Sequence, residues 1–139
     1  MSDLHLAIKA LEASDVTCAF VKDGAVETGG MHGIAPLLKL IEEGRTLEGF
    51  SAADRVVGKA AALLYAYLRV KELYAALISA SAEEVLRAHK IAYTYGTRVE
   101  GIVNRRGDGP CPMEIAVKEE NDPVQAVEVL RAKVREMRK

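Results

Sequence analysis

A strand–helix–strand pattern in the second half of the chain sets the strongest limit on the fold. Residues 72–79 (ELYAALIS) form an apolar run of strand length, residues 81–90 (SAEEVLRAHK) predict a helix that begins at Ser81, and residues 91–96 (IAYTYG) predict a second strand. Two consecutive strands that are joined by a helix lie parallel, with a right-handed crossover. The pattern therefore predicts an α/β protein with a parallel pair of strands.

The residues before this pattern predict a helix at the N-terminus, a β-hairpin and a short helix. Residues 16–29 contain the pair Asp23-Gly24, which supplies the positive φ angles of a tight turn between two strands. Residues 34–44 have helical periodicity, with Pro36 in the first turn. Because the strands of a hairpin are antiparallel, the sheet is expected to be mixed.

A long buried helix is predicted over residues 51–68. Ser51 and Asp54 have the spacing of a capping box, and the segment that follows is apolar on nearly every side. Near the C-terminus, a short helix is predicted to begin at Pro112 and the last helix at Pro123, because proline is common at first helical positions. Ser2 or Asp3 is expected to cap the first helix of the chain, and Asp122 the last. These elements complete the predicted order.

Composition and charge limit the classes of function. The 139 residues suffice for one domain, residues 1–139, and the net charge is −1. Such a chain is not expected to bind nucleic acid, and the basic residues 131–139 are expected to form a solvated helix face. No apolar run approaches the roughly 20 residues that cross a membrane. Cys18 and Cys111, with an N-terminus that lacks an apolar leader, predict a cytoplasmic protein with free thiols.

One segment raises the question of zinc chemistry. Residues 104–118 (NRRGDGPCPMEIAVK) contain a Pro-Cys pair, which forms most of the Pro-Cys-x-x-Cys signature of zinc-dependent deaminases. The second cysteine of that signature would stand at position 114, where this chain has Glu114. The motif is therefore incomplete.

Three stretches are specific enough to be compared with known families: residues 33–44 (GIAPLLKLIEEG), 51–64 (SAADRVVGKAAALL) and 104–117 (NRRGDGPCPMEIAV). They resemble a small prokaryotic family known only as a domain of unknown function, with a cytidine-deaminase-like fold. The predicted order of helix, hairpin, buried helix, strand, helix, strand and helix is also similar to that fold. The resemblance implies a three-layer α/β/α sandwich with a mixed sheet of about five strands.

The resemblance also locates the positions where deaminases hold zinc. One ligand lies at the start of the buried helix after the hairpin, and two cysteines lie at the start of the next helix. Here those places correspond to residues 52–61 and 78–85, which contain no His or Cys. Since zinc needs at least three such ligands, we expect no metal, no cofactor and no hydrolytic deamination.

A ligand pocket is implied at the N-termini of the two crossover helices, which attract anions. Arg55 and Lys59 are expected to share a helix face there, and Arg105 and Arg106 lie in a polar loop that can surround a phosphate or carboxylate. Alternatively, Asp54 only caps the helix, Lys59 extends to solvent and the loop is a solvated turn. The candidate ligand-binding residues are Asp54, Lys59, Ser79, Ser81, Asn104, Arg105, Arg106 and Asp108.

Three functions stay open at this point. The first is a zinc-free protein of deaminase-like fold that binds a nucleotide or another phosphorylated small molecule. The second is a group-transfer or hydrolytic enzyme with Asp54 as base or Cys111 as nucleophile, and the third is an oligomeric scaffold with a vestigial pocket. Homo-oligomerisation is expected through the small Ala-rich surface of residues 60–68, and His32 is the one histidine in a loop that could fold over the pocket.

Overall fold

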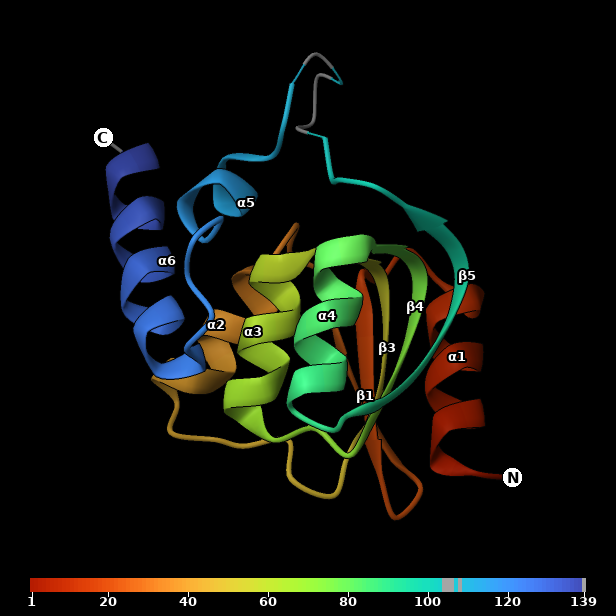
Figure 1. Cartoon of the computed structure of the whole chain (residues 1–139). Coiled ribbons are helices and arrows are strands. Elements are labelled where there is room, and N and C mark those ends of the chain that lie inside the picture. Colours follow the sequence, from red (N-terminus) through yellow and green to blue (C-terminus); the bar gives the residue numbers. More distant parts are fainter. Residues whose placement is uncertain (104–106, 108, 139) are drawn as a thin grey trace.

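The computed structural model describes residues 1–103, 107 and 109–138 and shows a five-stranded mixed sheet with helices on both faces (Figure 1). The strands have the order β2-β1-β3-β4-β5 across the sheet. β1 is antiparallel to β2 and β3, whereas β3, β4 and β5 are parallel. The predicted α/β class and mixed sheet are confirmed. The strands are β1 (Cys18–Lys22), β2 (Ala25–Gly29), β3 (Ser51–Val57), β4 (Glu72–Ser79) and β5 (Ala92–Val99).

The helices lie on the two faces of the sheet in an α/β/α arrangement. α1 packs on β1 and β3 from one side. α2, α3 and α4 lie on the other side, and α6 packs against α3 with the short α5 beside it (Figure 1). The helices are α1 (Asp3–Ala13), α2 (Ala35–Glu42), α3 (Lys59–Leu68), α4 (Ala80–Ala88), α5 (Pro112–Ala116) and α6 (Pro123–Met137).

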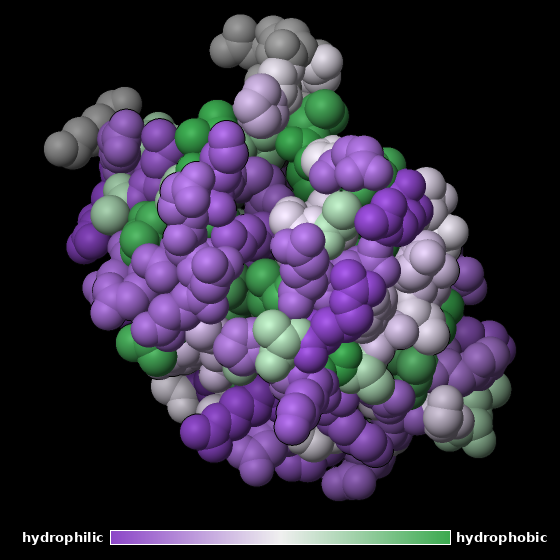
Figure 2. Space-filling view, viewed as in Figure 1, coloured by the Kyte–Doolittle hydropathy of each residue, from purple (hydrophilic) through white to green (hydrophobic). Residues whose placement is uncertain are grey.

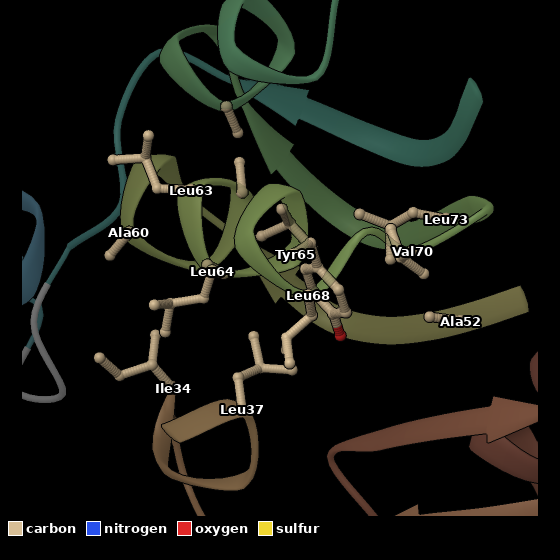
Figure 3. Packing of buried hydrophobic residues seen from close by; sticks show 14 of the residues in the cluster. Ile34, Leu37, Ala52, Ala60, Leu63, Leu64, Tyr65, Leu68, Val70 and Leu73 are labelled. Carbon is tan, nitrogen blue, oxygen red and sulfur yellow. The ribbon is translucent and has the colours of Figure 1, made fainter. Parts of the chain in front are cut away.

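α3 forms the centre of the larger of two hydrophobic cores. Figure 3 shows its side chains between Leu37 of α2 and residues of the sheet such as Ala52 and Leu73. The alanines of residues 60–68 that were expected to form an oligomer surface are therefore covered within the chain, except for the partly buried Ala66. Self-association stays a prediction, but its expected surface is wrong.

The local signals of the hairpin and of several helix ends are confirmed. Asp23 and Gly24 have φ angles of 51° and 81°, as a primed turn between paired strands requires. Ser2 accepts a hydrogen bond at the start of α1, and Asp122 does so at the start of α6. Residue types that favour one particular backbone position, such as a tight turn or a helix N-cap, thus predict these positions correctly.

The prediction of a helix from residue 51 is wrong. Residues 51–57 form β3, and α3 begins only at Lys59 with Gly58 as its N-cap. β3 lies between β1 and β4, and its first four residues are buried. A central strand that is covered on both faces has no polar alternation, so its apolar run resembles that of a buried helix.

Three further expectations are also wrong. Asp54 caps no helix because it lies within β3, and Arg55 shares no helix face with Lys59. The Arg55 guanidinium instead donates hydrogen bonds to backbone carbonyl oxygens at and after the end of α1, those of Leu11, Ser14 and Val16. α4 also begins earlier than predicted, since Ser79 rather than Ser81 is its N-cap.

Candidate ligand-binding site

The N-termini of α3 and α4 lie at the same edge of the sheet, because each follows one of two neighbouring parallel strands. Glu114 of α5 occupies the first of them. Its two carboxylate oxygens accept hydrogen bonds from the backbone N–H groups of Lys59 and Ala60, both 2.7 Å long. A carboxylate there satisfies free donors and complements the helix dipole. The anion at this helix is thus one of the protein's own side chains.

Gly58 makes room for the Glu114 carboxylate. A Cβ atom at this position would lie 2.5 Å from Oε1 of Glu114 and 2.8 Å from Cγ1 of Ile102. The Lys59 side chain also contacts the residues that follow α5, since its Nζ donates a hydrogen bond to the carbonyl oxygen of Lys118 over 2.9 Å. The described end of the segment 104–118 therefore meets Lys59 in space. Asn104, Arg105, Arg106 and Asp108 lie outside the described residues, and their role stays a prediction.

Asp54 lies inside the sheet, where only 7% of the residue is exposed. Its carboxyl group accepts a hydrogen bond of 2.7 Å from the hydroxyl of Tyr65 and one of 3.3 Å from the backbone N–H of Val56. Burial raises the pKa of Asp54 to about 7. The pKa of Cys18, its neighbour on β1, is raised to about 12 by burial and by the charge of Asp54.

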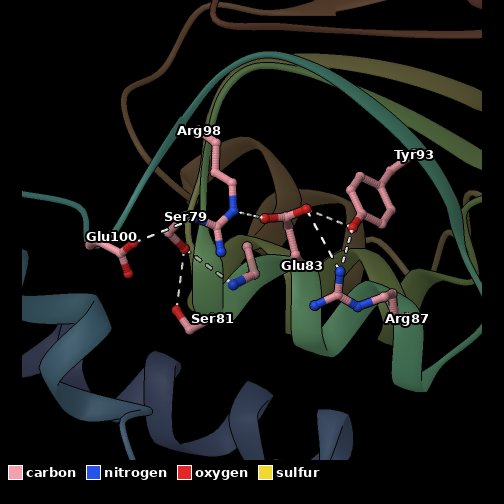
Figure 4. Close-up of polar contacts among 8 residues, drawn as sticks. Ser79, Ser81, Glu83, Arg87, Tyr93, Arg98 and Glu100 are labelled. Atoms are coloured by element: carbon pink, nitrogen blue, oxygen red, sulfur yellow. Dashed lines mark hydrogen bonds and ion pairs between the residues drawn. The ribbon is translucent and has the colours of Figure 1, made fainter.

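The polar groups at the start of α4 are also engaged within the chain (Figure 4). The hydroxyl oxygen of Ser79 accepts from the N–H of Ala82 at 3.1 Å and lies 3.2 Å from that of Ser81. Glu83 is 5% exposed and accepts from the hydroxyl of Tyr93 at 2.8 Å and from the guanidinium of Arg98. These contacts fix α4 to β5. Ser79 and Ser81 therefore have structural partners.

A cavity of about 740 Å³ opens between α2, the start of α5 and the C-terminal half of α6. Its walls are largely aliphatic, and no Phe, Tyr or Trp is among the described residues that line it. The face of the molecule that Figure 2 shows is mostly hydrophilic, with small hydrophobic patches scattered over it. The apolar lining includes Met31, Ile34, Leu38, Val56, Met113 and Val134.

Among the described residues that line this cavity are four cationic side chains and one carboxylate, that of Glu42. Within the described part of the chain, Lys39, Arg135 and Arg138 form no ion pair. Arg131 has one ion pair through its NH1 atom, but its Nε atom is buried and has no hydrogen-bond partner among those residues. Buried donors are normally bonded. The cavity is therefore an apolar space beside three exposed cations that the described chain does not pair and one half-buried arginine.

Sequence reasoning missed the cations of this cavity and found two of its other residues. Residues 131–139 were expected to be solvated, and Arg135 and Arg138 are exposed as expected, but together with the half-buried Arg131 they repeat at helical spacing on the face of α6 that lines the cavity. That spacing, shared with apolar Val134, was the available signal. His32 and Cys111, which were singled out from the sequence, both line the cavity. Asp54 is not among the lining residues.

Two negative findings apply to the described residues only. Residues 1–103, 107 and 109–138 contain no cluster of three or more His, Cys, Asp or Glu side chains that could hold a metal ion. The absence of zinc nevertheless stays a prediction. Among the same residues, every helix is too short or too polar to cross a membrane.

Comparison with known families places the chain. The family model for a domain of unknown function, DUF1893 (TM1506), matches residues 6–134. The chain belongs to the DUF1893 family. The crystal structure of a DUF1893 family protein (TM1506) from Thermotoga maritima superposes on this DUF1893 protein with a TM-score of 0.87 and 24% sequence identity, over 96% of this chain and 91% of the other. At that identity the likeness shows the fold alone. A comparison with functionally curated proteins gives no match.

Proposed function

We propose that this DUF1893 protein binds a small molecule with an apolar body and an anionic group in the cavity between α2, α5 and α6. The observation that carries the proposal is the pairing of an apolar lining with four cations, of which Lys39, Arg135 and Arg138 are exposed and form no ion pair among the described residues. Such groups remain free to form charge-assisted hydrogen bonds with an anion. A nucleotide or another phosphorylated molecule, the class proposed from the sequence, has both parts.

We also propose that the fold is a zinc-free relative of the cytidine-deaminase sandwich. In support, the helix that follows the hairpin is α2 and the next helix is α3. The deaminase ligand positions then correspond not to residues 52–61 and 78–85, as expected from the sequence, but to the turn before α2, which contains His32, and to the start of α3, which contains Gly58 and Lys59 but no cysteine. The cavity includes that turn before α2. In this view it is a remodelled deaminase pocket, in a cytoplasmic protein with free thiols at Cys18 and Cys111.

Group transfer through Cys111 is a second candidate function. His32 and Cys111 come from distant parts of the sequence and line the same cavity, and a thiol with a nearby imidazole is a common pair of nucleophile and base. The rate of alkylation of Cys111 by iodoacetamide tests this candidate in a Cys18→Ala background. A His32→Ala substitution is expected to slow the reaction at neutral pH several-fold. Equal rates would exclude an activating histidine.

Native mass spectrometry tests the binding proposal even though the identity of the ligand is open. We expect protein purified under mild conditions to carry an additional small-molecule mass that denaturation releases. The double substitution Arg131→Gln/Arg135→Gln is expected to lower the occupied fraction, whereas Lys133→Gln on the same helix, outside the lining, leaves it unchanged. An empty protein that also fails to bind AMP and alkyl phosphates by calorimetry would contradict the proposal.

A further inference from the structure

We propose that the ligand of this cavity carries an aliphatic chain rather than a nucleobase, so that the site accepts a short- to medium-chain acid with a carboxylate or phosphate head. This inference rests on the proposed function and narrows its ligand class. It follows from two properties of the lining: the kind of apolar surface and the placement of the cations.

The apolar lining fits an alkyl chain better than a planar base. Proteins that bind nucleobases stack them on aromatic side chains or guanidinium planes and pair polar groups with their edges. Here the apolar lining comes from aliphatic residues, proline and the methionines Met31, Met113 and Met137, and no Phe, Tyr or Trp is among the described lining residues. Methionine side chains adapt to irregular and flexible apolar partners. The lining therefore provides dispersion contacts, and among its described residues only His32 and the arginines offer a plane for stacking, of which the arginines are assigned to the acidic head.

The cations assign the acidic head to the side of the cavity formed by α6. Arg131, Arg135 and Arg138 line the cavity from that helix, and Lys39 lines it from α2. The NH1 atom of Arg131 is held by Glu128 at 3.4 Å and its Nε atom is buried, but 32% of the side chain is exposed, and Lys39, Arg135 and Arg138 are exposed and form no ion pair among the described residues. A carboxylate or phosphate oxygen accepts charge-assisted hydrogen bonds from these exposed guanidinium and ammonium groups. Glu42 is the only carboxylate among the described lining residues, so the cavity favours anions.

The size of the cavity agrees with one such molecule. Its volume of about 740 Å³ lies within the range of about 300–1,000 Å³ that is usual for small-ligand sites. A buried methylene group contributes about 0.8 kcal/mol, or roughly a fourfold gain in affinity. Affinity that increases with chain length is therefore the direct signature of an aliphatic ligand, whereas a nucleotide site gives no such series.

Isothermal titration calorimetry with the full chain tests the inference. The probes are butyl, hexyl and octyl phosphate, octanoate, AMP and inorganic phosphate, each below the concentration at which it forms micelles. We expect affinity to rise at least threefold from each alkyl phosphate to the next, and octyl phosphate to bind at least tenfold more tightly than AMP. Octanoate distinguishes a general acid site from one that requires phosphate.

Two variants locate the head group. Arg131→Gln is expected to weaken octyl phosphate binding at least fivefold, while Lys133→Gln, the matched control on α6, stays within twofold of the parent. AMP binding that equals or exceeds octyl phosphate binding would overturn the inference and leave the proposed function in place. Failure of every probe to bind would overturn both. Unchanged binding in Arg131→Gln, with the folded state confirmed by circular dichroism, would overturn the assigned head position.

Discussion

Two regions of this protein offer hydrogen-bond donors to an anion, and they differ in whether the chain itself satisfies them. At the start of α3, the N–H groups of Lys59 and Ala60 are bonded to the Glu114 carboxylate. At the cavity, Arg131 keeps a buried Nε atom without a partner among the described residues, and Lys39 forms no ion pair there. Donors of the first kind stabilise the fold, while donors of the second kind remain for a ligand.

The comparison also separates a structural acidic motif from a functional one. The sequence around Cys111 resembles part of a zinc motif, but Glu114, at the position of the missing cysteine, serves as a helix cap. The contact between α5 and the start of α3 is thus explained by its contribution to stability. If this division is correct, substitutions in the first region change the free energy of unfolding, and substitutions in the second change binding.

The largest expected effect concerns Asp54, whose carboxyl group has neutral donors rather than a cation as hydrogen-bond partners. Its pKa in the folded state is about 7, against an ordinary value of 3.8. The folded state binds the proton of the Asp54 carboxyl group more tightly than the unfolded state does. The stability that this difference contributes is fully present below pH 3.8 and is lost as the pH rises through about 7. The loss is at most about 4 kcal/mol. Asp54→Asn removes this loss.

Urea unfolding of the parent and Asp54→Asn proteins between pH 4 and pH 8 measures the effect. We expect similar stabilities near pH 4 and a more stable variant at pH 8. Tyr65 and Cys18, the titratable groups that face Asp54, have raised pKa values and stay neutral over this range. Parallel pH profiles for the two proteins would show that the Asp54 carboxylate is fully satisfied by its neutral donors.

Glu114→Ala is expected to destabilise the fold by about 3 kcal/mol, because two charge-assisted hydrogen bonds and a favourable helix-dipole interaction are lost. Glu114→Gln retains an acceptor and is expected to lose less. Glu119→Ala, at an exposed position of the same segment, is the matched control and should change stability by less than about 0.5 kcal/mol. Equal stabilities of the Glu114 and Glu119 variants in chemical unfolding would refute the role of the cap.

Gly58→Ala tests the same contact at the start of α3, with a smaller expected effect. The added Cβ atom displaces the flexible Glu114 side chain, with an expected cost of about 1–2 kcal/mol. In the Glu114→Ala background, the two nearest contacts of the added Cβ atom are removed and the contact with Ile102 remains, so the cost should fall. A double-mutant cycle measures the coupling between the two positions. Additive effects would mean that Gly58 has no part in the Glu114 contact.

Arg131→Leu is expected to have the smallest effect on the unliganded protein, within about 0.5 kcal/mol, because it removes a poorly satisfied cation and one partly exposed ion pair. Thermal unfolding measured with and without octyl phosphate checks both parts of the prediction. The ligand should stabilise the parent more than the variant. A loss of about 2 kcal/mol or more without ligand would place Arg131 among the structural residues and break the comparison.

The sequence predicted those parts of the fold that depend on local chemistry. The primed turn at Asp23-Gly24, strand β4 and the cap at Asp122 each follow from a few neighbouring residues. The beginning of α3 could not be predicted in the same way. Small apolar residues in β3 satisfy a strand and a helix equally, and only the positions of β1 and β4 decide between them.

The candidate site was predicted only in part, for a similar reason. The sequence singled out Cys111 as a candidate nucleophile and His32 as a loop residue that could fold over a pocket at the starts of the crossover helices, and both line the cavity between α2, α5 and α6 instead. It placed Lys59 at an anion site, but it could not show that Glu114 would fill that place, since the two residues meet only through the packing of α5. It also could not show that one face of α6 closes the cavity around Arg131.

A crystal structure of the complex with octyl phosphate would test the central claim most directly. The account predicts a phosphate oxygen within about 3 Å of a terminal guanidinium nitrogen of Arg131, the alkyl chain along the aliphatic lining, and Glu114 still bonded to the N–H groups of Lys59 and Ala60. A phosphate bound to those two N–H groups, with Glu114 displaced, would show that the start of α3 is the ligand site and would contradict the account.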